Sequence, residues 1–403
     1  MDKYFNNGID VLKKLHKNGH EAFFVGGYVR DMLLNIKSSD IDITTSALPE
    51  EVIEIFDNVK ETGKKYGGVT VIVDEFKYEV TTFRSDGEYY DNRHPSDVNY
   101  TKSIKSDLER RDFTINALVM DSDKIIHDNY NSKEDLGNKI IRTINDPLKR
   151  FEEDSLRILR AFRFVSKLDF DIEEKTLDAI IELSYLIKNI SIERVMIELN
   201  KIFKGKYRNK ALKYMIETGI DKELYGISEG LKFVSTLKQE LLPIEIFIIC
   251  FVLNDIDDKW KFSNKHYRLI DQILLLQEVT KKEKYNKFIV YVNGLEACLL
   301  SNKINVILGF ESQEMLIRKL ERELPIKDVC DLEFKGQDIL WLTTLKKKSV
   351  IGVVVDDLKY NVIMGYMPND YEILKKYALK KVDELQKEMG DNNEWVFLVF
   401  RWF

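Results

Sequence analysis

The stretch "FFVGGYVRDMLLNIKSSDIDITTS", residues 23–46, decides the fold of the N-terminal part, because it joins two strand-like runs to a glycine pair and closely spaced charges. The run before the glycines predicts a strand, and the residues after them predict a helix. The run "DIDIT" predicts a second strand, in which alternate side chains share one face. We therefore expect Asp40 and Asp42 to project together, while Ile41 and Ile43 face the core.

The two aspartates form a candidate metal site. Two like charges held this close repel each other unless a cation lies between them, and Mg²⁺ prefers a few hard oxygen ligands together with waters and substrate phosphates. Asp40 and Asp42 are therefore candidate Mg²⁺ ligands, and Glu79, a charge inside the strand-like run "YEVTTF", is a candidate third carboxylate. A charged surface turn and an exposed edge-strand position are the plainer interpretations of these residues.

The glycine pair, Gly26 and Gly27, lies between the first predicted strand and a helix expected to start near Tyr28. Glycine lets the backbone approach a ligand closely, and the N–H groups at a helix N-terminus bind phosphates. Arg30 would add a cation to such a site. A glycine pair at a strand end is more often simply a turn, so this interpretation depends on the neighbouring motifs.

The composition is that of a globular protein, and 403 residues predict more than one domain. No secretory signal pattern is visible, and the longest apolar run, "LLPIEIFIICFVL", is too short to span a bilayer and contains Glu245. We expect a buried helix there and a cytoplasmic protein without membrane segments. The three cysteines, Cys250, Cys298 and Cys330, stand in apolar surroundings, which predicts buried free thiols. The net charge of −6 argues only weakly against nucleic acid, since a local basic surface can still bind RNA.

The fold class predicted from the pattern is α+β. Residues up to about 145 alternate strand-like and helix-like segments, including a hairpin with its turn near Asp74 and Glu75. After Pro147 the apolar residues recur at spacings of three and four, which predicts helices only, followed by a small helical tail. The expected domains are residues 1–145, 146–210, 211–320 and 321–403.

Several motifs in a fixed order carry a family resemblance. "GGYVRD" and "DIDIT" are followed by "RRDFTINAL" at 110–118, "DPLKRFEEDSLRILRAFRF" at 146–164 and "SIERVMIELNKI" at 191–202. Together they resemble the nucleotidyltransferase superfamily, in the branch of class II (bacterial-type) CCA-adding tRNA nucleotidyltransferases and bacterial poly(A) polymerases. The resemblance implies a polymerase beta-like catalytic head followed by an all-α neck that reads the nucleotide base, an all-α body, and an all-α tail that binds tRNA.

The resemblance also implies a reaction, the transfer of a nucleotide from CTP or ATP to the 3′-hydroxyl of tRNA with release of pyrophosphate. Asp40 and Asp42 would hold Mg²⁺ by two-metal logic, with Glu79 completing or orienting that cluster. The remaining nucleotide-binding residues that it implies are Gly27 and Arg30 at the triphosphate, Arg111, Asp112 and Asn116 at phosphate and ribose, and Arg160 and Arg163 along the phosphates.

Asp154 and Arg157 are the expected base-reading pair. An i, i+3 spacing would make them neighbours on a helix, where an aspartate accepts and an arginine donates hydrogen bonds. Cytosine and adenine each present an amino donor beside a ring-nitrogen acceptor, so this pair complements C and A and mismatches U and G.

Other readings stay open. The polar segment from Arg84 to Val98 resembles the flexible loop of complete CCA-adding enzymes and disfavours a CC-only activity. A poly(A) polymerase, an enzyme adding only A, and a catalytically silent tRNA-binding protein are the alternatives. The chain departs from the family pattern at Asn131 and Ser132, which replace a glycine pair, and at Lys346, Lys347 and Lys348, which replace a glycine-proline element. Nothing indicates an oligomeric state.

Overall fold

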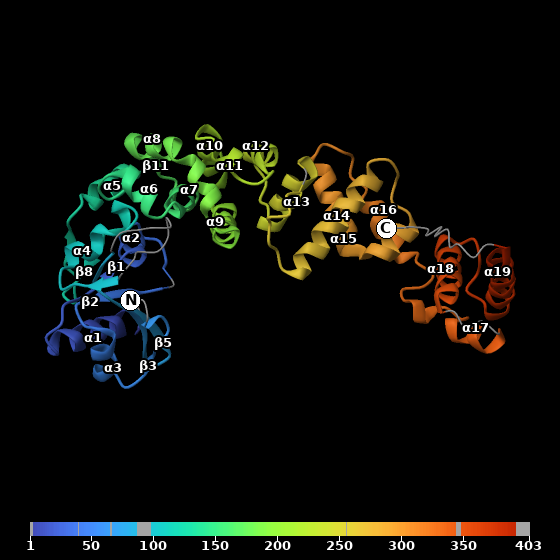
Figure 1. The fold of residues 1–403 in the computed structure, drawn as a ribbon, viewed down its shortest axis with the longest axis horizontal. Coiled ribbons are helices and arrows are strands. Elements are labelled where there is room, and N and C mark those ends of the chain that lie inside the picture. Colours follow the sequence, from blue (N-terminus) through green and yellow to red (C-terminus); the bar gives the residue numbers. More distant parts are fainter. Residues whose placement is uncertain are drawn as a thin grey trace. The chain divides into compact units, whose positions relative to one another are not determined.

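A computed structural model describes residues 3–38, 40–64, 67–86, 98–254, 256–343 and 348–391. The chain divides into two compact units, Met1–Lys261 and Phe262–Phe403, whose elements are labelled in Figure 1. The first unit combines the expected head and neck with part of the expected body, so the four-domain division stays a prediction. Most of the predicted loop between Arg84 and Val98 lies outside the described residues, as do Lys346 and Lys347.

The head contains a mixed seven-stranded sheet with the order β3-β4-β5-β2-β1-β8-β9. Strands β2 and β5 run parallel, and the other neighbouring pairs in this sheet are antiparallel. The bounds of these strands are β1 Ala22–Val25, β2 Asp42–Thr45, β3 Val59–Lys60, β4 Gly68–Val73, β5 Phe76–Thr82, β8 Leu118–Met120 and β9 Ile126–Asp128.

Apolar side chains that alternate along the strands build the core of the head. Phe24, Ile43 and Val80, from three neighbouring strands, are all buried. Helices α1 (Lys3–Lys17) and α3 (Pro49–Ile55) lie on one face of the sheet, and α2 (Gly27–Leu33) lies on the other (Figure 1). The predicted hairpin is confirmed, because Val73 pairs with Phe76 and leaves the two predicted residues between them as the turn.

Shorter elements follow in the head: β6 Arg84–Asp86, β7 Val98–Tyr100, α4 Ile104–Glu109, the 3-10 helix η2 Thr114–Asn116, α5 Ser132–Asn138 and β10 Ile140–Ile141. The turn in which Asn131 and Ser132 replace the family's glycine pair nevertheless forms. Asn131 adopts a left-handed conformation with φ 55°, which asparagine tolerates better than most residues. The Asp128 carboxylate accepts hydrogen bonds from the backbone N–H groups of Tyr130, Ser132 and Lys133 there.

The remainder of the first unit is helical with one exception. Its helices are α6 Pro147–Glu153, α7 Leu156–Leu168, α8 Glu174–Glu182, η3 Ser184–Asn189, α9 Ile192–Lys204, α10 Arg208–Glu217, α11 Ile220–Glu223, α12 Ser228–Thr236 and α13 Pro243–Leu253. The expectation of helices alone is wrong at β11 (Asp171–Ile172), which pairs in parallel with β10. Asp169 ends α7 in a left-handed conformation, so the chain leaves the helix and becomes extended.

Helix α13 confirms the predicted buried helix, since its residues from Glu245 to Phe251 are all buried. In the described part of the chain, no helix is both long and apolar enough to cross a bilayer.

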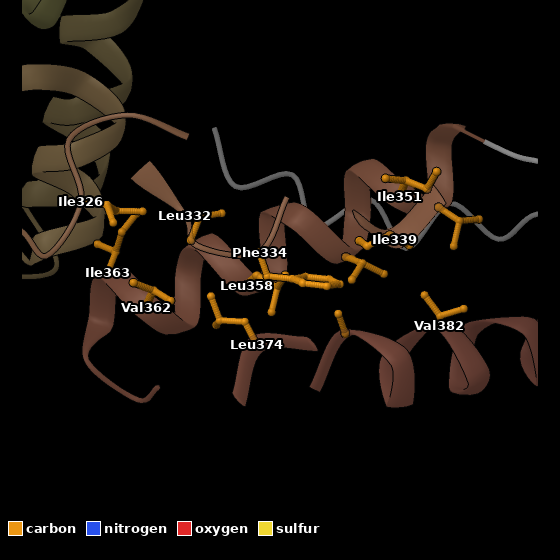
Figure 2. Packing of buried hydrophobic residues seen from close by; sticks show 13 residues of the cluster. Ile326, Leu332, Phe334, Ile339, Ile351, Leu358, Val362, Ile363, Leu374 and Val382 are labelled. Carbon is orange, nitrogen blue, oxygen red and sulfur yellow. The ribbon is translucent and has the colours of Figure 1, made fainter. Parts of the chain in front are cut away.

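The second unit is helical throughout its described residues. It contains α14 Asn264–Thr280, α15 Lys287–Ile307 with an interruption at Gly294, α16 Glu314–Arg322, the 3-10 helix η4 Val329–Asp331, α17 Gly336–Leu342, α18 Lys348–Met364 and α19 Tyr371–Asp391. Figure 2 shows its C-terminal core, a buried cluster that includes Leu358 and Val362 of α18 together with Phe334 and Leu374. The predicted helical tail thus has its own hydrophobic core.

The cysteines only partly follow the expectation. Cys250 and Cys298 are buried, and burial raises the pKa of both thiols. Cys330 is exposed, so its predicted burial is wrong. It lies in the short 3-10 turn η4, whose N-cap residue Asp328 accepts a hydrogen bond from the Cys330 N–H, and this capped turn stands at the surface.

Candidate nucleotide site

A cavity of about 570 Å³ opens in the first unit, a size that suits a small ligand. Eight of its sixteen lining residues are arginines. It is lined by Gly26, Gly27, Arg30, Asp42, Arg84, Arg110, Arg111, Asp112, Asn116, Asp154, Leu156, Arg157, Arg160, Arg163, Phe164 and Arg194. So much positive charge at one point of a chain with net charge −6 indicates a site for a polyanion such as a triphosphate.

The predicted glycine turn forms one wall of the cavity. Gly26 has φ 70°, a conformation that favours glycine, and a Cβ added there would lie 3.4 Å from Arg111 Nη1. Arg30 is buried with its guanidinium turned toward the protein, where Nη1 donates to Asn116 Oδ1 at 2.5 Å and Nε donates to Asp31 Oδ1 at 2.8 Å. Arg30 therefore lines the cavity beside the glycine turn, but much of its donor capacity is used inside the protein, and its contact with the triphosphate stays a prediction.

Asp112 and Arg160 form a tight pair beside this turn. Arg160 Nε and Nη2 both donate to Asp112 Oδ2, at 2.7 and 2.5 Å, while the Phe113 N–H and Asn116 Nδ2 donate to Oδ1. Burial alone would raise the pKa of Asp112, but Arg160 and these hydrogen bonds hold it at about 2. Asp112 is thus ionised and fully engaged, which fixes Asn116 and Arg160 at the cavity wall.

The acidic side of the site lies on two neighbouring strands. Asp42 at the start of β2 is directly opposite Glu79 of the parallel strand β5, so their side chains share one face of the sheet. Asp40 precedes β2 instead of lying in it, and Ile41 is buried as expected. Desolvation raises the pKa of Asp42, as do the charges of Glu79 and Asp40, and only Arg111 opposes them.

These carboxylates fit a cation by their chemistry, since like charges are held close together and hard oxygens are the donors. The described residues nevertheless contain no group of three His, Cys, Asp or Glu side chains placed to hold one metal ion. Asp42 lines the cavity, whereas Asp40 and Glu79 do not. Glu79 as a third carboxylate at the metal therefore stays a prediction.

The expected base-reading pair is present in the cavity but is not a helical pair. Asp154 is extended, with φ −144°, and it separates α6 from α7, so the i, i+3 argument does not apply. Arg194 Nη2 of α9 donates to both carboxylate oxygens of Asp154, at 3.0 and 3.1 Å. Arg157 Nη1 donates to Glu153 Oε2 at 2.7 Å. Asp154 and Arg157 are each held by a different partner.

Phe164 of α7 organises three of the arginines. The guanidinium carbons of Arg30, Arg163 and Arg160 lie 5.2, 5.4 and 5.8 Å from its ring centroid, within the range of cation–π attraction. Arg163 also approaches Glu198 at 3.5 Å, and burial lowers the pKa of its guanidinium. The ring is thus a common neighbour of three arginines, each of which also has its own carboxylate partner, Asp31, Asp112 or Glu198.

Three family models match the chain. They are described as "Poly A polymerase head domain" over residues 22–142, "Probable RNA and SrmB- binding site of polymerase A" over 169–225, and "tRNA nucleotidyltransferase domain 2 putative" over 246–378. The CCA-adding enzyme of Ligilactobacillus salivarius is 35% identical over 393 residues, which cover 94% of this chain and 97% of that protein. The CCA-adding enzyme of Enterococcus faecalis is 34% identical over 396 residues, which cover 95% of this chain and 98% of that protein.

The chain belongs to the CCA-adding enzymes of the tRNA nucleotidyltransferase/poly(A) polymerase family. The crystal structure of the Bacillus stearothermophilus CCA-adding enzyme in complex with CTP agrees, with a TM-score of 0.81 and 30% identity over 96% of this chain and 100% of that one. The Thermotoga maritima enzyme complexed with tRNA shares the fold at 20% identity and a TM-score of 0.65. The family resemblance and the α+β fold class are thereby confirmed, and this family typically uses a divalent metal ion.

Some cavity residues of this CCA-adding family member were not singled out from its sequence. Arg84, Arg110 and Arg194 line the cavity beside the predicted arginines. Arg110 stands next to a predicted residue in "RRD" and could have been included on that ground. Arg194 reaches Asp154 across forty positions of the chain, and no local pattern signals such a contact.

Proposed function

We propose that this protein adds C, C and A to the 3′ end of tRNA from CTP and ATP, releasing pyrophosphate. One observation carries the proposal: a triphosphate-sized cavity rich in arginine lies beside paired carboxylates, in a chain whose nearly full-length relatives are CCA-adding enzymes. The arginines supply the anion site, and the carboxylates supply the hard oxygen ligands that a metal-assisted transfer needs.

Asp40 and Asp42 would hold Mg²⁺ at the acidic side of the cavity. Burial is the largest cause of the raised pKa of Asp42, and the charges of Glu79 and Asp40 raise it further; a divalent cation would relieve this repulsion, which supports the assignment. When bound, the metal supplies activation of the attacking 3′-hydroxyl and charge neutralisation at the leaving pyrophosphate. Glu79, opposite Asp42 in the sheet, would orient this pair through its charge.

The triphosphate would lie along the arginines that line the cavity. Arg111 Nε is buried without a hydrogen-bond partner in the described part of the chain, so it is a donor for a phosphate oxygen. Gly27 leaves room for close approach of the backbone, while Arg30 contributes mainly its charge because Asp31 and Asn116 occupy its donors. Asp112 would act on the ribose side through its hold on Asn116 and Arg160.

Base selection would rest on Asp154 and Arg157. Arg194 fixes the orientation of the Asp154 carboxylate, and Glu153 together with the carbonyl oxygens of Arg150 and Arg110 fixes the Arg157 guanidinium. An acceptor and a donor held in fixed positions can match the amino and ring-nitrogen groups of C and A. With U or G, donors would face donors, at a cost of about 1 to 3 kcal/mol for each mispaired group.

The overall activity is tested with a tRNA that lacks its 3′ CCA, supplied with CTP alone, ATP alone or both in the presence of Mg²⁺. Resolving the products to one nucleotide should show two additions with CTP alone and three with both nucleotides. Long A tails would replace the proposal with a poly(A) polymerase. Growth only on a tRNA already ending in CC would indicate an A-adding enzyme, and no growth at all would indicate a silent tRNA-binding protein.

The metal assignment predicts that Asp40→Ala abolishes addition, because one of the two ligands is lost, while tRNA binding is nearly unchanged. Turnover and tRNA affinity by gel shift would be measured on the same preparation. Wild-type turnover in this variant would remove Asp40 from the metal site.

The base-selection assignment predicts that Arg157→Ala increases incorporation of UTP and GTP relative to CTP and ATP by about tenfold or more. Arg163→Ala is the matched control, because Arg163 lines the same cavity from the same helix and is assigned to the phosphates. It should weaken nucleotide binding without relaxing selectivity. Equal selectivity in Arg157→Ala and the wild type would contradict the assignment.

A further inference from the structure

A buried carboxylate, Asp107 of α4, lies behind Arg110 and Arg111, two of the arginines that line the cavity. Its side chain is fully buried and does not line the cavity itself. Arg110 donates to its Oδ1 through Nε at 3.0 Å and through Nη2 at 2.7 Å. Arg111 Nη2 donates to its Oδ2 at 3.1 Å. One carboxylate thus holds two consecutive cavity arginines from behind.

Two further contacts connect Asp107 to other walls of the site. The hydroxyl of Thr44 donates to Oδ2, and the backbone N–H of Arg84 donates to Oδ1, both at 3.3 Å. Thr44 follows Asp42 by two residues on β2, and Arg84 begins β6 and lines the cavity. Asp107 therefore connects β2, the strand that carries Asp42, with the start of β6 and with Arg110 and Arg111.

The charges of Asp107, Arg110 and Arg111 together leave a net positive charge at the cavity, which suits an anionic ligand. Two guanidinium groups that share one carboxylate keep a net charge of about +1, which is left for an incoming anion. Without the carboxylate, Arg110 and Arg111 would repel each other and lose their fixed orientation. Burial would raise the pKa of Asp107, but the two arginines hold it below its ordinary value, so the carboxylate is ionised.

We propose that Asp107 is a positioning residue of the nucleotide site: it directs the guanidinium groups of Arg110 and Arg111 toward the triphosphate, without touching the nucleotide. The inference rests on the proposed function for the identity of the ligand. The alternative is a purely structural role, in which Asp107 only stabilises the turn between α4 and η2. The two roles differ in whether nucleotide affinity falls independently of stability.

The test is equilibrium dialysis of CTP and ATP in the presence of Mg²⁺ and without tRNA, comparing Asp107→Asn with the wild type. Loss of the charge should raise the Kd of both nucleotides by about tenfold and by the same factor, because they share the triphosphate. For CMP, which lacks the β- and γ-phosphates, the ratio of Kd values between variant and wild type should be smaller. A Kd for CTP within twofold of the wild type would overturn the proposal.

Asp135→Asn is the matched control, because Asp135 is also buried and ion-paired with an arginine, Arg142, but neither residue lines the cavity. It should lower the melting temperature while leaving the Kd of CTP within twofold of the wild type. An equal rise of the Kd in this control would assign the effect of Asp107 to general loss of stability.

Reversible partial unfolding of Asp107→Asn would raise its apparent Kd by the reciprocal of the folded fraction, so the folded fraction is measured by circular dichroism and the Kd is corrected for it. If none of that variant folds, Thr44→Val decides, since it removes one hydrogen bond from Asp107 and leaves its charge. A rise in the Kd of both nucleotides would support the proposal, and an unchanged Kd would overturn it. Failure of the wild type to extend tRNA would instead count against the proposed function, because the dialysis uses no tRNA.

Discussion

Single side chains in this site are fixed by several partners at once. Asp112 accepts hydrogen bonds from Phe113, Asn116 and Arg160, so two cavity residues, Asn116 and Arg160, depend on one ionised carboxylate. Its low pKa measures how strongly these partners favour the charged form. Polar groups that shape the cavity therefore also contribute to the stability of the head.

We predict a pH-dependent loss of stability in Asp112→Asn. The pKa of Asp112 falls from its ordinary value of 3.8 to about 2 in the folded protein. The stabilisation is therefore fully present above about pH 4 and disappears as the pH falls toward 2, and it amounts to about 2 kcal/mol. Urea unfolding should show this deficit in the variant at pH 7 and a smaller one near pH 3. The exposed Asp178→Asn serves as control, and an equal deficit at both pH values would contradict the prediction.

At the residue scale, the sequence predicted which side chains line the cavity better than it predicted their partners. Motif order placed Asp154, Arg157 and Arg160 in one cavity, and the structure brings them there. The pairing of Asp154 with Arg194 depends on how α9 packs beside α7, which no local spacing encodes. Asp154 is extended and ends α6, so it does not form the helical i, i+3 pair with Arg157 that the sequence predicted.

At the scale of elements, close packing between helices depends on small residues at their crossing points. Gly230 of α12 lies against Cys250 of α13, where an added Cβ would be 2.3 Å from the Cys250 Cα. Gly205, after α9, approaches Ser166 of α7 as closely. These contacts hold helices of the first unit together, and of these helices α7 supplies five of the sixteen residues that line the cavity, while α9 supplies Arg194.

Gly230→Ala should lower the free energy of unfolding by about 1 to 3 kcal/mol, because the new methyl group meets backbone that cannot move aside cheaply. Gly352→Ala is the matched control, since Gly352 lies inside α18 with nothing within 4 Å of an added Cβ. That change should stabilise the helix by about 0.5 to 1 kcal/mol. Chemical denaturation of both variants measures the difference, and a stabilised Gly230→Ala would show that the two helices separate easily.

The sequence predicted the types of these elements well, because apolar periodicity distinguishes the strands of the head from the helices that follow. It did not predict the short β10-β11 pair, since two-residue strands form only when the neighbouring segments bring them together. The parallel register that sets Asp42 opposite Glu79 is also a tertiary result.

At the scale of the whole molecule, the nucleotide cavity lies entirely within the first compact unit. The end of that unit is well secured: Trp260 is buried, and its indole N–H donates to the Tyr225 carbonyl oxygen at 2.8 Å. The second unit has its own core around Leu358 and Leu374 (Figure 2). This division predicts that nucleotide binding does not require the second unit.

A fragment of residues 1–261 should therefore bind CTP with the Kd of the full chain, because every lining residue of the cavity is retained. Its KM for tRNA should rise by about tenfold or more, since contacts from the second unit no longer add to the first. Calorimetry with CTP and a steady-state assay with tRNA measure the two effects. A folded fragment that does not bind CTP would show that the second unit is needed to shape the cavity.

Of the three cysteines only Cys330 is exposed, so a dye can be attached to the protein at a single site. Cys250 and Cys298 are buried with raised thiol pKa values, so a maleimide dye at mildly alkaline pH should attach at Cys330 alone. Its hydrogen bond to Asp328 raises the pKa of Cys330 as well, which slows labelling at neutral pH but leaves the sulfur accessible. A fluorophore there would label the second unit alone, and a change in its emission when tRNA is added would test the prediction that the tail binds tRNA.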